Sequence, residues 1–553
     1  MPTPQTSPGS RPARDHHATG GDAATTAQLR ALRPSPQEAG LDVATLLQGR
    51  IDRLFATIPL IGELGELFAQ AGHDLHLVGG SVRDALMGTL GHDLDFTTDA
   101  RPEETERLLR SRTRAVWDIG RAFGTIGARI DRWVVEVTTY RTDVYRPDSR
   151  KPEIAYGRSL DEDLVRRDFT VNAMALHAAT REFSDPHHGL ADITAGLLRT
   201  PFPPQRSFSD DPLRMMRAAR FTSQLGFTVT EETAEAMAQM AERITIISAE
   251  RVRDELSRTL LTDHPRPGLD LLVRTGLADH VLPELPALRL ERDEHHRHKD
   301  VYEHTLTVLE QSIDLERARG HEPDLTGRLA ALLHDIGKPA TRRFEPGGKV
   351  SFHHHDVVGA KLARKRLRAL SYPTEVVKDV STLVALHLRF HGYGDQGWTD
   401  SAVRRYVRDA GDQLERLHIL TRSDCTTRNR RKAERLEFAY DDLERRIAEL
   451  RAAEELDAVR PDLDGAQIME ILGIRPGPLV GRAYAFLLNL RLDEGPHTPE
   501  QAREALLAWW ADQPESGHQP EPGPQSRPDR SGPDEEPDRL DHDDPRSGRR
   551  GSD

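Results

Sequence analysis

The sequence predicts an α+β N-terminal domain, built on a small mixed sheet with helices, followed by a long all-α region. Three observations support this fold class. The chain has 553 residues, which is too long for a single hydrophobic core. Short β-rich runs gather between about residues 75 and 143. After about Phe208 the apolar residues recur at the 3.6-residue period of amphipathic helices, so the chain is mostly helical overall.

Composition indicates a globular protein with unstructured ends. Charged residues make up 30% and hydrophobic residues 37% of the chain. Residues 1–40 and 513–553 are rich in Pro, Gly and polar side chains without any apolar period, which predicts disordered tails. The sequence shows no signal peptide or membrane span, and Cys425 is its one cysteine. We therefore expect a cytoplasmic protein without disulfides.

The formal net charge of −14 taken alone argues against nucleic-acid binding. The charges are segregated, however, because acidic residues exceed basic ones in the tail, while arginines cluster elsewhere, as at residues 428–432. A basic groove on an acidic protein therefore stays open as an interpretation.

The N-terminal elements follow in order along the chain. Residues 41–71 have a helical pattern, and LHLVGGSVRDALMG predicts a strand, a glycine turn and a helix. HDLDFTTDA predicts another strand. AFGTIGARI and RWVVEVTTYRTD predict two adjacent antiparallel strands separated by Asp131. The polar stretch TDVYRPDSRKPEIAYGRSLDED predicts a mobile loop, and the pattern becomes helical from DEDLVRRDFTVNAMAL onward.

Gly79 and Gly80 end the first strand, just before a helix. Glycines let backbone N–H groups approach a phosphate closely, and the positive end of the following helix points to the same place. Arg83 in the first turn would add a charged contact. The alternative is an ordinary glycine turn.

Asp93 and Asp95 are two residues apart on a predicted strand, so both carboxylates face the same side. Such a pair can hold the divalent ions that stabilise the attacking and leaving oxygens in phosphoryl transfer. Glu136 on a neighbouring predicted strand is a further candidate for this metal site. A solvated carboxylate pair and a salt-bridged strand glutamate are the alternatives.

LVGGSVRD and DLDFTTDA resemble the signature of the nucleotidyltransferase superfamily that includes CCA-adding enzymes and bacterial poly(A) polymerases. RRDFTVNAMA resembles the ribose-contacting motif of that family, DDPLRMMRAARF its nucleotide-selecting motif, and SAERVRDEL its neck-helix motif. The resemblance implies the bacterial and eukaryotic class, with a head, a neck and a helical body. It also implies tRNA as partner, ATP and CTP as substrates, and two Mg²⁺ ions as cofactors.

The third motif places Arg167, Asp168 and Asn172 at the nucleotide. A carboxylate such as Asp168 could accept a hydrogen bond from a ribose hydroxyl and so favour ribonucleotides. Its alternative role is an N-cap or a partner for Arg166 or Arg167.

In DDPLRMMR, Asp210, Arg214 and Arg217 are spaced i, i+4 and i+7, which predicts one helix face. An acceptor and donors on one face could read the base edges of cytosine and adenine without a nucleic-acid template. The alternative is an ordinary salt bridge. The family usually has Glu where Asp210 stands, and the resemblance implies that Asp211 orients the arginine. We expect Glu250 and Arg251 to fix the neck helices against each other.

Relatives of this class add CC, A, CCA or poly(A). By the resemblance, CC-adding enzymes lack much of the polar loop, so its presence here favours completion of the final A. We therefore expect addition of C, C and A. The alternatives are a poly(A) polymerase, or an HD phosphohydrolase whose nucleotidyltransferase half only binds RNA.

A second metal site is predicted in the helical region. His304, the adjacent pair His334 and Asp335, and Asp424 follow the order of ligands in the HD phosphohydrolase superfamily, which this segment resembles. His355 and His387 are further candidates. Imidazole and carboxylate suit Mn, Fe, Ni, Co or Mg, and a bound metal would activate water against a phosphate ester.

These observations predict an organisation in six parts: a disordered tail at 1–40, a catalytic head at 41–200, a neck that selects the nucleotide at 201–294, an HD domain at 295–453, a C-terminal helical segment at 454–512, and a second tail at 513–553.

Overall fold

The computed structural model describes residues 42–517 except 90, 92, 145–152, 158, 291–299, 347–349, 394–397, 428 and 455–459. Both predicted tails lie almost wholly outside the described residues. Within the described part, no helix is long and apolar enough to cross a membrane. The chain forms two compact units, one made of residues up to 399 together with 405–449, and one made of 400–404 together with the residues from 450 onward.

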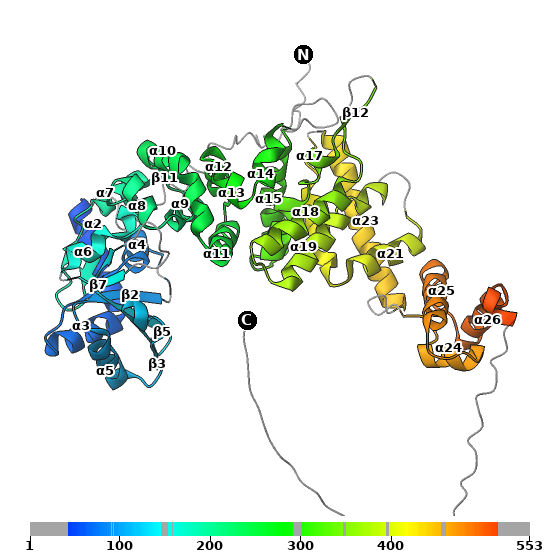
Figure 1. Ribbon diagram of the computed structural model, residues 1–553, viewed down its shortest axis with the longest axis horizontal. Helices are drawn as coiled ribbons and strands as arrows, with labels where there is room; N and C mark the ends of the chain where they lie inside the picture. Colours follow the sequence, from blue (N-terminus) through cyan, green and yellow to red (C-terminus); the bar gives the residue numbers. More distant parts are fainter. Residues whose placement is uncertain are drawn as a thin grey trace, which may run out of the picture. The chain divides into compact units, whose positions relative to one another are not determined.

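A seven-stranded mixed sheet organises the N-terminal part, as the sequence predicts (Figure 1). The strand order is β3-β4-β5-β2-β1-β8-β9, and of the paired neighbours only β2 and β5 run parallel. The strands are β1 (Leu75–Val78), β2 (Asp93–Thr98), β3 (Val116–Trp117), β4 (Thr125–Ile130), β5 (Trp133–Thr139), β8 (Ala175–His177) and β9 (Phe183–Ser184).

Helices pack against this sheet. Residues predicted as one helical stretch form two helices, α2 (Val43–Thr57) and α3 (Pro59–Gln70), because Pro59 begins the second helix. α4 (Gly80–Met87) follows β1 directly, and α5 (Pro102–Arg112) follows β2. Leu64, Leu77, Leu94 and Val135 are fully buried in the core of this part.

Two predictions for this part are wrong in detail. The polar segment after β5 contains a hairpin of β6 (Arg141–Val144) and β7 (Glu153–Tyr156). This segment lacks the alternation of apolar and polar residues by which strands are predicted from sequence. Residues 145–152 of the expected loop lie outside the described residues. The run DEDLVRRDFTVNAMAL, predicted to be helical, contributes only α6 (Leu160–Val165) and a 3-10 turn before β8, since a short buried apolar run is consistent with either helix or strand.

Helices form most of the next part, which also contains the short strand β11 (Thr228–Val229). The helices are α8 (Pro204–Asp210), α9 (Leu213–Leu225), α10 (Glu231–Met240), α11 (Ala249–Leu260), α12 (Arg266–Arg274), α13 (Leu277–Val281) and α14 (Glu284–Ala287). α9 packs on both α11 and α12 through residues such as Met215, Ala219 and Leu256, all of which are buried.

The following helical bundle consists of α15 (Val301–Ala318), α16 (Leu325–Leu333), α17 (Lys338–Thr341), α18 (His355–Ala369), α19 (Thr374–Leu386), α21 (Asp400–Ala410), α22 (Leu414–Ser423) and α23 (Arg430–Glu454). A small hairpin of β12 (Arg343–Phe344) and β13 (Val350–Ser351) precedes α18.

The second compact unit is a three-helix cluster. α24 (Gly465–Leu472), α25 (Pro478–Glu494) and α26 (Pro499–Ala511) surround a small core that includes Ile468, Ala483, Leu487 and Leu506. Asp464 and Thr498 begin α24 and α26 with capping boxes, which fixes where these helices start.

Candidate nucleotidyl-transfer site and candidate metal centre

Three carboxylates meet at one edge of the β2–β5 pair. Asp93 and Asp95 lie on β2, and the parallel register places Asp95 opposite Glu136 on β5. Because residues two apart on a strand share a face, and residues in register on neighbouring strands also share it, all three side chains lie on the same side of the sheet. The predicted adjacency of Glu136 to the aspartates is thereby confirmed.

The electrostatics of this cluster are unfavourable without a cation. Burial raises the pKa of Asp95 to about 6, Arg167 partly opposes that rise, and the negative charges of Glu136 and Asp93 add to it. Carboxylates that destabilise one another in a partly buried place are suited to a divalent ion, which supplies the missing positive charge.

The glycine turn lies directly beside these carboxylates. Gly79 has a φ of 70°, a left-handed conformation that favours glycine, and a Cβ there would lie 3.0 Å from Arg167 Nη1 and 3.9 Å from Asp95 Oδ2. Ser81 in the first turn of α4 holds the helix to β2, since its hydroxyl donates to the Asp93 carbonyl and accepts from the Asp95 N–H, both at 3.1 Å. The start of α4 and the carboxylates are therefore fixed relative to each other. Ser81 is a positioning residue that the sequence analysis missed, although it stands inside the Gly-Gly-Ser turn.

Arg167 is the cation nearest to the carboxylates. Its Nη2 donates to Asp163 at 3.0 Å, while Nη1 lies beside Gly79. The buried Asp163 also pairs with Arg166, so one acid holds the two neighbouring arginines. This arrangement directs Arg167 toward the place where a triphosphate would meet the turn.

Arg83, predicted to contact phosphate, is instead built into the protein. Its side chain is buried, donates to Asp84 and, at 2.6 Å, to Asn172 Oδ1, and lies over the ring of Phe221. Asn172 donates in turn to Asp168 at 2.9 Å. Arg83 and Asn172 therefore connect α4 to the ribose motif.

Asp168 connects that motif to the helix α9. Arg217 donates to its Oδ2 at 2.7 Å, and the Phe169 N–H and Asn172 donate to its Oδ1. Burial alone would raise the pKa of Asp168, but Arg217 and these hydrogen bonds outweigh burial and hold it below its ordinary value. Asp168 thus stays charged, and its partner is Arg217 rather than the Arg166 or Arg167 considered from sequence.

The predicted common helix face of Asp210, Arg214 and Arg217 is wrong as stated. α8 ends at Asp210, Asp211 is extended, and α9 begins at Leu213, because a residue before proline avoids helical backbone and Pro212 follows Asp211. Arg214 and Arg217 share α9, while Asp210 ends the preceding helix. Arg214 is buried and donates to Ser207 Oγ at 2.8 Å and to the Arg166 carbonyl at 2.5 Å.

Asp211 and α11 complete this region. Asp211 Oδ1 accepts from the Leu213 N–H at 3.0 Å and Oδ2 from Arg251 at 3.1 Å, so it caps α9 and ties it to α11. The predicted structural role of Arg251 is confirmed. Glu255, which the sequence analysis did not single out, is buried between Arg217 and Arg220, at 3.7 Å and 2.7 Å. Its spacing of four residues from Arg251 on an amphipathic helix is the only sequence signal for it.

The second cluster forms where helices end. His304 lies in the first turn of α15, His334 ends α16, His355 begins α18, His387 ends α19 and Asp424 ends α22. Asp335 follows His334 directly, and His304 Nε2 lies 2.9 Å from Asp424 Oδ1. The fold brings together all six side chains that the sequence proposed.

The imidazoles of this cluster are oriented alike. The Nδ1 atoms of His334, His355 and His387 lie 2.8, 2.8 and 2.6 Å from the backbone carbonyls of the residues three positions earlier, and His304 Nδ1 lies 3.1 Å from Thr426 Oγ1. Since a carbonyl accepts only, Nδ1 of His334, His355 and His387 carries the proton, and their Nε2 atoms are left as acceptors. This is the tautomer of a metal ligand held by an outer hydrogen bond.

Unsatisfied atoms show that these residues fit a metal. His334 Nε2 and His387 Nε2 are buried without a hydrogen-bond partner, and such atoms are costly unless an ion takes them. Two ligand groups share Asp335: one with His304 and His334, and one with His355 and His387. Either group could hold a divalent ion, and Asp335 belongs to both.

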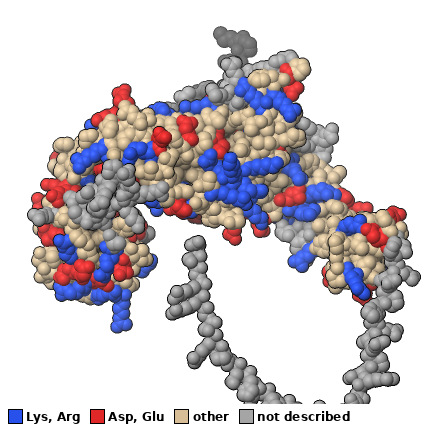
Figure 2. Space-filling model, in the orientation of Figure 1, with Lys and Arg blue, Asp and Glu red and all other residues tan. Residues whose placement is uncertain are grey.

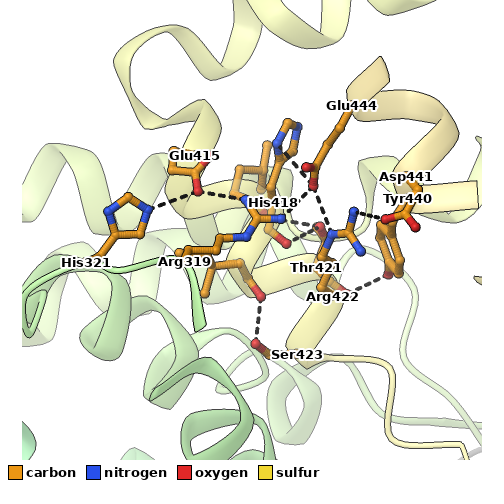
Figure 3. A network of polar contacts seen from close by, with 12 residues as sticks. Arg319, His321, Glu415, His418, Thr421, Arg422, Ser423, Tyr440, Asp441 and Glu444 are labelled. Carbon is orange, nitrogen blue, oxygen red and sulfur yellow. Dashed lines mark hydrogen bonds and ion pairs between the residues drawn. The ribbon is translucent and has the colours of Figure 1, made fainter. Parts of the chain in front are cut away.

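A polar network surrounds the end of α22, just before Asp424 (Figure 3). Arg319, which caps the end of α15, donates to Glu415 on α22 and to Glu444 on α23, both at 2.7 Å, and Arg422 donates to Glu444 at 2.9 Å. Because Arg422 is two residues before Asp424, three helices together fix the end of α22. Lys338, three residues after Asp335 and 2.8 Å from its Oδ2, is a further cation at the cluster that the sequence analysis missed.

Comparison with known proteins matches these two sites. Residues 75–199 match the family of the poly A polymerase head domain, and residues 226–288 match the family described as "Probable RNA and SrmB- binding site of polymerase A". Residues 301–429 match the HD domain family. The A-adding tRNA nucleotidyltransferase of Deinococcus radiodurans is 34% identical over 448 residues, which cover 80% of this chain and 96% of that protein. The chain belongs to the tRNA nucleotidyltransferase family.

Other tRNA nucleotidyltransferases extend the comparison. The CC-adding enzyme of Thermus thermophilus is 32% identical over 79% of this chain and 94% of that protein. The crystal structure of the Bacillus stearothermophilus CCA-adding enzyme in complex with CTP aligns with a TM-score of 0.61 at 24% identity, covering 82% of this chain and 98% of that one, and so shows the shared fold. The nucleotidyltransferase and HD regions both imply the use of divalent metal.

Proposed function

We propose that this tRNA nucleotidyltransferase adds C, C and A to the 3′ end of tRNA from CTP and ATP without a nucleic-acid template. The observation that carries the proposal is the register of Asp95 and Glu136 on paired strands, with Asp93 on the same face and Gly79 and Arg167 beside them. Full-length relatives named as A-adding, CC-adding and CCA-adding enzymes support the reaction class.

In the proposed reaction the terminal 3′-hydroxyl of tRNA attacks the α-phosphate of the nucleotide. The new O–P bond forms as the bond to the β-phosphate bridge breaks, pyrophosphate leaves and the hydroxyl proton is released. Asp93 and Asp95, with Glu136 beside them, would hold two Mg²⁺ ions, which when bound stabilise charge on the attacking and leaving oxygens. Gly79 and the first turn of α4 give the triphosphate close access to backbone N–H groups, and Arg167 supplies a positive charge there.

Asp168 would accept from a ribose hydroxyl, because Arg217 and Asn172 keep it ionised and fixed. Arg214 and Arg217 on α9 would face the base, with Asp210 and Asp211 at the preceding break. Arg83 and Asn172 would act by positioning Asp168. Placement in the cytoplasm accords with this function.

We assign the head to 41–200, the neck to 201–294, the HD domain to 295–453 and the C-terminal segment to 454–512. The matched family regions at 75–199, 226–288 and 301–429 each fall inside one of these parts.

The proposal is tested with tRNA that ends before its last three nucleotides. Purified protein is incubated with CTP and ATP, and the product 3′ ends are sequenced. The proposal predicts CCA on this substrate and A on tRNA that already ends in CC. Addition of CC alone would assign the protein to the CC-adding enzymes, and addition of A only to the longer substrate would assign it to the A-adding enzymes. A run of A would assign it to the poly(A) polymerases. No addition to either substrate would refute nucleotidyl transfer.

A second activity is supported by the orphaned acceptors of the HD centre. We propose that His304, His334, Asp335, His355, His387 and Asp424 hold one or two divalent ions of unassigned identity that, when bound, activate water against phosphate esters. Hydrolysis of bis-p-nitrophenyl phosphate is measured with Mn²⁺, Ni²⁺, Co²⁺ and Mg²⁺. His334→Ala should abolish it and Asp95→Asn should not, whereas turnover that persists in His334→Ala would refute an HD-centred reaction.

A further inference from the structure

A stripe of four cations runs along the exposed face of α18. Lys361, Arg364, Lys365 and Arg368 are all exposed, and at 100° per residue they fall within about 100° of arc around the helix axis. From Lys361 to Arg368 the stripe rises by seven residue steps, or about 10 Å along the helix. Figure 2 shows Lys and Arg side chains gathered over α18 on this face.

These four cations are not neutralised by the protein. None of them forms an ion pair with a carboxylate among the described residues, whereas Arg366 on the same helix is paired with Glu284 at 2.8 Å. The one acidic residue of α18, Asp356, lies in its first turn. A cluster of unpaired cations is notable in a chain whose net charge is −14, because like charges held side by side repel unless a polyanion covers them.

The far end of α18 rests on the region matched to an RNA-binding family. Glu284 belongs to that region, as does Arg253, which donates to the Ser371 carbonyl at 2.6 Å just after α18 ends. Ser257 and Tyr372 share a further hydrogen bond at 2.9 Å. The helix that carries the cationic stripe is therefore joined to residues 226–288 by direct contacts within the same compact unit.

We infer that the exposed face of α18 binds the phosphate backbone of tRNA. Successive phosphates of one strand are spaced so that about 10 Å of helix can meet two or three of them, and Lys and Arg are the side chains that bind them. Val357 is the only exposed large hydrophobic residue on α18, so the face lacks the apolar side chains that would enter a lipid surface. The identity of the RNA rests on the proposed function, while the phosphate-binding chemistry rests on the stripe itself.

The test compares tRNA binding by the unmodified protein and by a variant in which all four cations of the stripe are neutral. Affinity for tRNA lacking its last three nucleotides is measured from 50 to 300 mM KCl. If the stripe meets two or three phosphates, the slope of log affinity against log salt falls by about 2–3, and affinity at 100 mM KCl falls at least tenfold. The substitutions are Lys361→Gln, Arg364→Gln, Lys365→Gln and Arg368→Gln.

A matched control removes the same amount of charge elsewhere. Four exposed arginines that already have carboxylate partners are replaced by Gln, and this variant should keep the affinity and the slope of the unmodified protein. Equal losses in the two variants, or no loss in the stripe variant, would overturn the inference. So would binding of the stripe to phosphatidylserine vesicles in place of tRNA. The control residues are Arg107, Arg110, Arg317 and Arg445.

A third variant exchanges Lys for Arg and Arg for Lys within the stripe, which keeps the charges and should restore binding. Because the stripe lies outside the proposed catalytic residues, the neutral variant should raise KM for tRNA severalfold and leave kcat unchanged. Failure of the unmodified protein to add nucleotides, with salt-sensitive tRNA binding through α18 intact, would refute the proposed function and leave this inference standing.

Discussion

Base selection by Arg214 can be tested sharply because the structure fixes part of its side chain. The guanidinium has five N–H donors. One donates to Ser207 Oγ in a buried contact, and another donates to the Arg166 carbonyl in a part-buried contact. Arg214→Ala therefore removes two internal hydrogen bonds as well as any donors that reach the base.

The two consequences differ in size and in kind. Each lost hydrogen bond from a charged donor to a base costs about 1.5–3 kcal/mol, which is roughly a ten- to 150-fold loss of discrimination. The acceptors left at Ser207 and Arg166 reduce stability by about 1–3 kcal/mol each. Only the first consequence depends on which nucleotide is offered.

The assay measures kcat/KM for CTP, ATP, UTP and GTP on tRNA ending before CCA. Arg214→Ala should raise incorporation of UTP and GTP relative to CTP by at least tenfold. Ser207→Ala serves as control, because it removes the internal partner and keeps the guanidinium, and it should keep the preference for CTP. If Arg214→Ala slows all four nucleotides by the same factor, Arg214 is structural and the reasoning fails.

Three other predictions follow. Asp95→Asn should lower nucleotide addition by at least about 10²-fold, through loss of a metal-holding carboxylate, while tRNA affinity stays within twofold; near-normal addition would contradict the proposed site. Asp335→Ala should remove all metal from the HD centre, whereas His355→Ala should remove only the ion of one ligand group. Metal analysis measures both, and CCA addition should stay intact in both variants. Unchanged metal content in Asp335→Ala would exclude Asp335 as the shared ligand. Burial lowers the pKa of His418 to about 4, below its ordinary value of 6.5, so its contribution to stability is present above pH 6.5 and is lost as the pH falls toward 4. When the pH falls from 7.5 to 5, the unfolding free energy of His418→Gln should therefore fall by roughly 2 kcal/mol less than that of the unmodified protein. An identical pH dependence in the two proteins would show that His418 is not held neutral.

Several features of the site were predictable because they depend on short stretches of chain. Asp93 and Asp95 share a face by the two-residue period of a strand, and the Gly79–Gly80 turn with its helix follows from local backbone preferences. Helical periodicity likewise predicted the all-α region, and the adjacent His334 and Asp335 drew attention to the HD centre. These features require only neighbours in sequence.

The break between Asp210 and Arg214 could also have been predicted locally. Pro212 excludes helical backbone at Asp211, yet the i, i+4 spacing of acid and arginine outweighed that signal in the interpretation of the motif. A spacing of four residues places two side chains on one helix face only where the backbone between them is able to stay helical.

Only the tertiary structure decided which groups meet. Glu136 was a candidate from its predicted strand, but its place beside Asp95 depends on the register of two strands about 40 residues apart. The contact of Asp168 with Arg217 and the convergence of five helix ends on Asp335 depend on packing in the same way. The sequence alone established which chemical groups each segment carries and which local structure it favours, because both depend only on the side-chain types and their period along the chain. Distances between segments are set by the burial of many side chains at once, so the protonation of Asp95, the engagement of Arg214 and the unpaired cations of α18 appear only in the folded molecule.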